Sequence, residues 1–590
     1  MSERNHKIIF IGSFIIVTAL AILAVYSSKM HKEETFTLNL SASELDKRTD
    51  SKYLIDINLL DENAPEYKNL SNNDKEALKH LVKAAYILEN IQLNLDNRDN
   101  IAFKNFLIKE SNKGNKNAQK TLILFNAQRG MNAIDRESHH INLAKNHDDL
   151  LGKGFYPADL SEKEFHLILT KMIKNGEVDM VKKILNQRSI VERNGDKLIA
   201  TDYIDKFKEE FNQIANELEA AAQVSSDDNF NEYLNLQAKA LRTANPMLDA
   251  YADKKWATLQ NTPLEFTITR ENYSDGLTKT ILSNPELANL LKEVSITPIM
   301  KDSLGCRVGI VNQKATENLL KIKQYLPKLA SLMPFHEKYQ QNIKAQGEVK
   351  QTMVDVDLVA MTGDCGAYRG GITIAENLPN DDKLSLTIGG GRRNVYHRQV
   401  RQMFTPEKTK KKIDAILDSS LHKYYNTEAS HWFTAGHENM HSLGPNSGCE
   451  NLGKYQSIIE ENKADMGSLA FIDVLVKEGM YDENQRNQII VTSVLNNFLK
   501  AKPTMAQAHR VRSIMQIHYL KKEGAIAMNK EDKIYIDRDK AVLAAQKMLK
   551  DIIKIQISKD INKAEKFVND NFVWDEMCEK IAIKLKSVDS

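Results

Sequence analysis

The sequence is poor in cysteine. Its four cysteines, Cys306, Cys365, Cys449 and Cys578, lie far apart among 590 residues and form no CxxC pair. This spacing excludes a zinc ribbon and a thioredoxin-type redox motif. A disulfide can form if this part of the chain lies outside the cytoplasm, but the spacing does not indicate which cysteines would pair.

Neither sign of charge is in excess. The chain has 81 Lys and Arg residues against 79 Asp and Glu residues, a formal net charge of +2. It lacks the basic stripe with which proteins bind the phosphate backbone of nucleic acids. The stretch IGGGRRNV at residues 388–395 also lacks the GxxxxGK[ST] frame of a phosphate-binding loop, and it predicts a flexible turn after a strand. We therefore expect no nucleic-acid partner.

One long apolar run departs from this composition. Residues 8–26 are uncharged and follow Arg4 and Lys7. The run is close to the ~20 residues needed to cross a bilayer. We predict that residues 1–30 are a signal anchor; the alternative is a cleaved signal peptide, because the small residues of VYSS at 25–28 offer a cleavage site. Either way, the rest of the chain is expected to be membrane-anchored or secreted, and therefore extracytoplasmic (periplasmic in a bacterium).

Helical periodicity dominates the first part of the chain. Residues 75–92 and 202–224 repeat apolar residues at i, i+3, i+4 and i+7, which predicts amphipathic helices. Between them, residues 187–204 predict a short hairpin that turns at Asn194 and Gly195.

A sheet is predicted in the middle of the chain. β-branched residues alternate with others from 264 to 310, and strand runs punctuated by glycine continue up to Gly391. After Val400 the pattern is helical again up to the C-terminus. The order of these patterns predicts an α+β fold that is predominantly helical.

The stretch HENMH places His437 and His441 four residues apart with Glu438 between them. On a helix, both imidazoles lie on one face and can bind the same ion. Zinc prefers such donors, and a catalytic zinc site has three protein ligands and one open position. Glu438 would then accept the proton of an attacking water. Fifteen histidines in 590 residues predict only about 0.02 HExxH matches by chance.

The third ligand is sought in the helical stretch IIEENKADMG. Glu461 and Asp465 are four residues apart, so one carboxylate can bind the metal while the other accepts the N–H of a ligating histidine. We therefore favour Glu461 over Glu460 as the ligand and assign Asp465 to the supporting role. A solvated acidic helix start is the alternative. Cys449 could also bind zinc, although a lone loop cysteine is more often a small packed residue.

Together these motifs resemble the dipeptidyl peptidase III family of zinc exopeptidases. HENMHSLGP and EENKAD are the most specific parts, and the resemblance continues through GFYPADL, LNQRSIVERNGDKL, TPLEFTITRENYSDG, GDCGAYRGGITIAENLPND and QAHRVRSIMQIHYLKKEGAI, over about residues 155–527. It is greatest to the branch found fused to Nudix domains, which shares the regular HExxH spacing where better-studied members have HExxGH. No Nudix box is present, so nucleotide hydrolysis is not expected.

The resemblance implies roles for two residues of RENYSDG. Tyr273 matches the tyrosine that donates a hydrogen bond to the scissile carbonyl oxygen as negative charge develops. Glu271 matches the carboxylate that binds the free amino terminus of the substrate. Residues two apart share one face of a strand, so the pair can serve one substrate.

Further roles follow from the same resemblance. Asn377 and Asn380 match asparagines that hold the peptide backbone, and His509 matches a histidine that faces the zinc and is counted here among the catalytic residues. Arg512 lies near the position of a family arginine without matching it, so no role is assigned to it.

The family also implies two lobes around a wide cleft. A mixed substrate-binding lobe with a β-barrel-like sheet is expected at residues 35–290 and 350–400. A helical zinc-binding lobe is expected at residues 291–349 and 401–590.

We therefore expect a gluzincin-like metallopeptidase with one Zn²⁺ per chain that releases dipeptides from the N-termini of short peptides. The alternative is a membrane-anchored peptide-binding protein that keeps the scaffold but is catalytically weak or inactive. A third hypothesis is that the metal only joins two helices.

Overall fold

The structure is a computed structural model. It describes residues 36–589 except 51–56, 58, 135–139, 272–274, 282–283, 340–351, 365–374, 379–387, 389–392, 400–405, 446–448, 500–501 and 504–507. The predicted anchor at residues 1–30 lies outside this part, as do Tyr273 and Asn380. Among the described residues, no helix combines the length and the apolarity that crossing a membrane requires.

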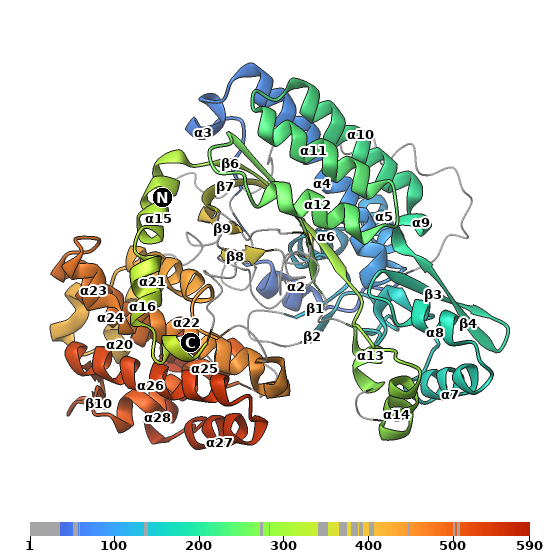
Figure 1. Cartoon of the computed structure of the whole chain (residues 1–590). Helices are drawn as coiled ribbons and strands as arrows, with labels where there is room; N and C mark the ends of the chain where they lie inside the picture. The colour runs from blue at the N-terminus through green and yellow to red at the C-terminus, as the bar shows by residue number, and fades with distance from the viewer. Residues whose placement is uncertain are drawn as a thin grey trace. The chain divides into compact units, whose positions relative to one another are not determined.

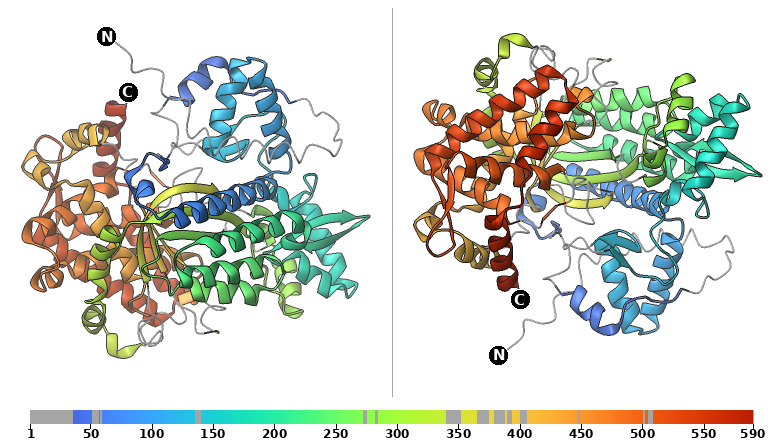
Figure 2. Two further views of the ribbon diagram at one scale, coloured as in Figure 1. Left: turned by 90° about the horizontal axis from the view of Figure 1, so that it is seen from above. Right: turned by 90° about the horizontal axis from the view of Figure 1, so that it is seen from below.

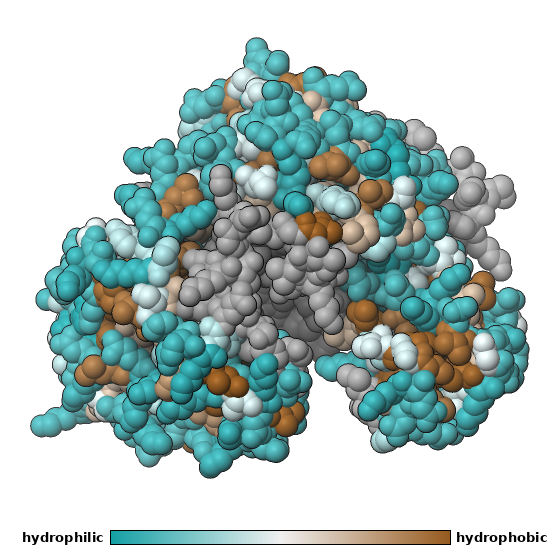
Figure 3. All heavy atoms as spheres, viewed as in Figure 1, coloured by the Kyte–Doolittle hydropathy of each residue, from teal (hydrophilic) through white to brown (hydrophobic). Residues whose placement is uncertain are grey.

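The chain forms two compact units. The first comprises Met1–Asn312, Val354–Ile374 and Leu378–Met403, and the second comprises Gln313–Met353, Ala375–Asn377 and Phe404–Ser590. Each unit has a large apolar core of its own, and the first has an additional smaller core around Phe103 and Phe125. The face drawn in Figure 3 is mainly hydrophilic, in line with the 27% of charged residues.

The first unit combines helices with strands (Figure 1). Its helices are α2 (Ala42–Arg48), α3 (Pro65–Lys68), α4 (Asn72–Asp96), α5 (Asn100–Asn112), α6 (Lys116–Gln128), α7 (Glu162–Lys174), α8 (Val178–Ile184), α9 (Tyr203–Lys206), α10 (Lys208–Val224), α11 (Asp228–Leu241), α12 (Pro246–Trp256), α13 (Gly276–Ile281), α14 (Pro285–Glu293) and the 3-10 turn η1 (Lys153–Phe155). Its short strand pairs are β1 (Asn132–Ile134) with β2 (His140–Asn142) and β3 (Ser189–Asn194) with β4 (Lys197–Asp202).

Local sequence explains these elements. The Ser71 side chain caps α4 by accepting from the N–H of Asp74, and α4 packs along β6 (Figure 2). The predicted hairpin is confirmed as β3–β4, which pair in antiparallel register from Ser189↔Asp202 to Asn194↔Lys197. Gly195 in its turn has φ +62°, a conformation that favours glycine.

The main sheet has the strand order β5-β6-β7-β9-β8 and is curled. Its strands are β5 (Leu264–Glu271), β6 (Ser303–Val311), β7 (Thr352–Gly363), β8 (Ala375–Leu378) and β9 (Arg393–His397). β6 pairs antiparallel with both β5 and β7, and its register against β7 shifts between Val308 and Gly309, an irregularity that bends a strand. Every residue of β6 and β7 is buried, so these strands are the interior of the sheet.

The curled sheet and the predominance of helix confirm the predicted fold class. The predicted lobe boundaries differ from the structure in more than one place. Met353 and Ala375–Asn377, assigned from the sequence to the mixed lobe, belong to the second unit. Residues 291–312, assigned from the sequence to the helical lobe, belong to the first unit, in which residues 303–310 of β6 pair with β5. The alternating pattern had indicated a strand there, but its partner could not be read from the sequence.

The second unit is helical. Its elements are α15 (Gln313–Lys323), α16 (Leu326–Leu332), α20 (Pro406–Ile416), α21 (Thr427–Met440), α22 (Gln456–Ala470), α23 (Ile472–Lys477), α24 (Glu483–Phe498), α25 (Ala508–Lys522), α26 (Arg538–Ser558), α27 (Ile561–Asn571), α28 (Glu576–Asp589), the 3-10 turns η2 (His336–Lys338), η3 (Ser419–Tyr424) and η4 (Cys449–Tyr455), and the strands β10 (Ile526–Met528) and β11 (Ile534–Ile536). α22 is buried along most of its length and packs against α21, α25 and α26. These helices carry the candidate site.

Candidate metal centre

α21 brings the two histidines of the HExxH motif together. Asn426 caps its start by accepting from the N–H of Glu428. The helix ends at Met440, and His441 is its C-cap with φ −60° and ψ −28°. Because this last residue keeps the helical conformation, its side chain stays on the same face as His437.

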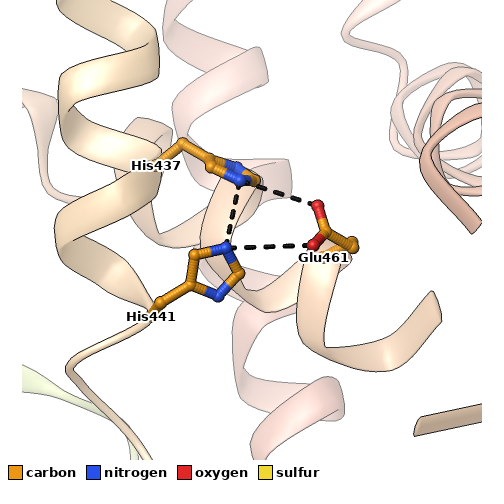
Figure 4. A group of neighbouring side chains, drawn as sticks. All are labelled: His437, His441 and Glu461. Carbon is orange, nitrogen blue, oxygen red and sulfur yellow. Dashed lines mark hydrogen bonds and ion pairs between the residues drawn. The ribbon is translucent and has the colours of Figure 1, made fainter. Parts of the chain in front are cut away.

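α22 approaches α21 closely through two glycines. A Cβ at Gly436 of α21 would lie 2.2 Å from Ser468 Oγ, and a Cβ at Gly467 of α22 would lie 2.8 Å from Met440 Sδ. Larger residues at these positions would force the helices apart. The close approach places the Glu461 carboxylate beside both imidazoles (Figure 4).

The three side chains have the spacing of ligands around one ion. His437 Nε2 lies 3.1 Å from His441 Nε2, 3.6 Å separates His437 Nε2 from Glu461 Oε2, and 3.9 Å separates His441 Nε2 from Glu461 Oε1. Tetrahedral zinc with bonds of about 2.0–2.2 Å holds its ligand atoms roughly 3.4 Å apart. Two imidazoles and one carboxylate are also a donor set of catalytic zinc sites. The residues therefore fit a zinc ion.

Each histidine is oriented by a carboxylate on its other nitrogen. His437 Nδ1 lies 2.7 Å from Asp465 Oδ1, and His441 Nδ1 lies 2.9 Å from Glu460 Oε1. An N–H on Nδ1 leaves the lone pair on Nε2, where a metal would bind. Asp465, for which the sequence predicts a supporting role, thus contacts His437, and that role stays a prediction. Glu460, which has no role in the prediction from sequence, supports His441 in the same way. A second histidine ligand was the signal for a second such carboxylate.

Both supporting carboxylates are held ionised. Burial favours the neutral form of Glu460, but the Lys463 ammonium and the hydrogen bond with His441 outweigh it and lower the pKa of Glu460 to about 2. Burial likewise opposes ionisation of Asp465, but Arg512 and His437 bring its pKa well below the usual range. In turn, although burial opposes its charged form, the carboxylates raise the pKa of His441. The site therefore favours a cation.

Glu438 lies beside the three donor atoms. Its Oε1 is 4.0 Å from His437 Nε2, and its side chain is largely buried. A carboxylate this close to the nitrogen that faces the donor group lies within reach of a water bound there.

Three more side chains contact the two supporting carboxylates, and the sequence did not predict them. Lys463 Nζ lies 2.7 Å from Glu460 Oε1, and Gln556 of α26 donates to Glu460 Oε2 at 2.8 Å. Gln516 of α25 donates to Asp465 Oδ2 at 2.9 Å. The two glutamines come from helices distant in sequence, so no local spacing pointed to them.

The remaining predicted residues are placed only by their backbones or not at all. Glu271 is the last residue of β5, Asn377 lies in β8 and His509 lies in the first turn of α25. Their side chains lie outside the described part, as do Tyr273 and Asn380 entirely. Their roles stay predictions.

The fold and the donor group define an α+β protein of two units, one of which carries a candidate catalytic metal centre of the HExxH type. Comparison with solved structures gives this fold a name: it is that of dipeptidyl peptidase III. The enzyme from Caldithrix abyssi has a TM-score of 0.76 and 21% identity over 92% of this chain and 97% of its own. The enzyme from Corallococcus sp. strain EGB has a TM-score of 0.71 and 19% identity over 93% of this chain and 96% of its own. The resemblance predicted from the motifs is confirmed in the fold.

Sequence comparison adds one curated relative, Nudix hydrolase 3 from Arabidopsis thaliana. It is 21% identical over an alignment of 442 residues that covers 71% of this chain and 54% of the relative. The chain thus spans about half the length of the relative that it matches. No protein-family model matches the chain.

Proposed function

We propose that this protein is a zinc metallopeptidase that removes dipeptides from the N-termini of short peptides. The observation that carries the proposal is the group of His437, His441 and Glu461, whose donor atoms lie within 4.8 Å of one another on a dipeptidyl peptidase III fold. Glu438 beside the group supplies the acid–base function that peptide hydrolysis needs.

Each residue of the site has a separate role in this proposal. His437, His441 and Glu461 would hold one Zn²⁺ per chain, which when bound polarises a carbonyl group and lowers the pKa of water. Glu438 accepts the proton of the attacking water and delivers it to the departing amine. Asp465 and Glu460 hold the two imidazoles with Nε2 facing the group.

The resemblance supplies the roles on the substrate side. Glu271 would bind the free amino terminus, and this requirement would make the enzyme an exopeptidase. Asn377 and Asn380 would hold the peptide backbone. Tyr273 would donate a hydrogen bond to the carbonyl oxygen, and His509 would assist catalysis.

Glu438→Ala tests this proposal in the full chain. We expect turnover of dipeptidyl substrates with a fluorescent leaving group to fall about 10²–10⁴-fold, which is the usual contribution of general acid–base catalysis. Zinc content by elemental analysis should stay at one per chain, because the three donor side chains are unchanged. Glu428→Ala is the matched control, since Glu428 lies exposed at the start of the same helix.

The same measurements separate the competing hypotheses. Undiminished dipeptide release by Glu438→Ala would overturn the peptidase proposal. Bound zinc and bound intact peptide without cleavage in the wild type would indicate a peptide-binding protein. Collapse of the fold on chelation, with Glu438 dispensable, would indicate a metal that only joins helices.

A further inference from the structure

Arg512 of α25 contacts two carboxylates of α22 that lie one helical turn apart. Its Nη1 donates to Glu461 Oε2 at 2.5 Å, and its Nε lies 3.0 Å from Asp465 Oδ2. One guanidinium therefore joins a proposed metal ligand to the carboxylate that orients His437.

The side chains that make these contacts are largely buried, so their charges are only weakly screened by water. The side chain of Asp465 is 2% exposed, that of Arg512 14% and that of Glu461 16%. Two carboxylates this close repel each other in a partly dry environment, so the cation between them lowers the cost of their burial. The planar guanidinium donates from Nη1 to Glu461 in a fixed direction while its charge lies beside Asp465, whereas an ammonium is a point charge.

A second contact from the same helix fixes Asp465 independently. Gln516, one turn after Arg512, donates to Asp465 Oδ2 at 2.9 Å, and its own oxygen accepts from Asn497 at 2.9 Å. Asp465 thus keeps a hydrogen-bond partner when Arg512 is changed, whereas Glu461 loses the hydrogen bond from Arg512 to its Oε2.

His441 is supported by a different pair of residues, Glu460 and Lys463. Lys463 donates to the Leu443 carbonyl at 2.6 Å and lies 2.7 Å from Glu460. Lys463 therefore contacts Glu460, which accepts from Nδ1 of His441 and is not a proposed metal ligand. Arg512, in contrast, acts directly on a proposed ligand.

We propose that Arg512 is a positioning residue of the metal centre. Its guanidinium engages Oε2 of Glu461, so that Oε1 is the oxygen offered to the metal, and it keeps Asp465 in line with His437. This inference rests on the proposed function, because it requires that Glu461 is a metal ligand.

Geometry and charge predict different outcomes for two substitutions. Arg512→Lys keeps the positive charge but loses the planar group that donates to Glu461 in a fixed direction. A purely electrostatic role therefore predicts unchanged zinc affinity for this variant. Arg512→Gln removes a positive charge that repels the metal, so electrostatics alone predicts tighter binding. A positioning role predicts weaker binding in both variants.

The test is zinc affinity of the metal-free full chain, measured by competition with a chromophoric chelator, together with the visible absorption spectrum of the Co²⁺-loaded protein. We expect both variants to bind zinc about 10–100-fold more weakly, the usual effect of losing a residue that orients a ligand. The Co²⁺ spectrum should also change, because the Glu461 carboxylate is no longer fixed. A residue that only stabilises the fold would leave this spectrum unchanged.

Arg486→Lys is the matched control. Arg486 of α24 also spans two carboxylates in the same unit, with Nε 2.5 Å from Asp473 and Nη2 2.9 Å from Asp539. Wild-type affinity and spectrum in Arg512→Lys and Arg512→Gln would overturn this inference and leave the proposed function intact. A wild-type chain that binds no zinc would overturn both.

Discussion

At the scale of single residues, Lys301 is a buried titratable group outside the metal centre. It is 1% exposed, and its ammonium donates to the carbonyls of Ile184 and Asn186 and to the hydroxyl of Ser189, at 2.5–2.8 Å. These acceptors are neutral. Burial lowers the pKa of Lys301 to about 7, against the opposing effect of two aspartates.

Stability should therefore depend on pH through Lys301. The unfolded chain, in which a lysine has a pKa of about 10.4, binds a proton between pH 7 and 10 that the folded chain does not bind. The free energy of unfolding should rise with pH over this range, by about 3 kcal/mol between pH 7 and 9.5. Urea denaturation of the wild type and of Lys301→Met at both pH values checks this.

The methionine variant should lose this pH dependence, because it has no proton to bind. Lys292→Met is the control, since Lys292 is exposed in the last turn of α14. An identical pH dependence of wild type and Lys301→Met would show that Lys301 is charged in the folded protein throughout this range.

At the scale of elements, the contact between α21 and α22 decides whether the donor group forms. In Gly436→Val the Cβ would lie 2.2 Å from Ser468 Oγ, and the two methyl groups add further bulk at this contact. We expect a loss of about 1–3 kcal/mol in the free energy of unfolding, which is usual for overpacking. Zinc affinity should fall as well, because α22 carries Glu461.

Thermal denaturation and zinc titration of this variant measure the two effects. Gly524→Val is a useful comparison for backbone strain, because Gly524 has φ +71° and no heavy atom within 4 Å of its Cβ position. That control should cost stability without changing zinc affinity. Equal zinc affinity in Gly436→Val and wild type would show that the close helix approach does not position Glu461.

At the scale of the whole molecule, we propose that residues 1–30 anchor the chain in a membrane. The 19-residue apolar run at 8–26 is long enough to cross a bilayer. We expect the full chain to sediment with membranes and to resist extraction by high salt, whereas a chain lacking residues 1–30 is released. A full chain that is recovered in the soluble fraction with its N-terminus after residue 28 would indicate a cleaved signal peptide.

The sequence by itself determined the local parts of this protein. Helical periodicity predicted α4 and α10, the Asn194-Gly195 pair predicted the turn between β3 and β4, and the motif spacing pointed to His437, His441 and Glu461. The helices, the turn and the shared face of His437 and His441 each depend on residues within one or two helical turns or one hairpin, where backbone geometry alone fixes which side chains share a face. The meeting of Glu461 with the two histidines also needs α21 and α22 to pack together.

Only the tertiary structure decided the rest. The pairing of β6 with β5, and the meeting of Arg512, Gln516 and Gln556 at the two supporting carboxylates, join segments separated by up to about a hundred residues. Such contacts depend on how helices and strands pack, and a single sequence records no distance between them. The donor group could thus be predicted from the sequence, while the side chains that hold it in place became visible only in the fold.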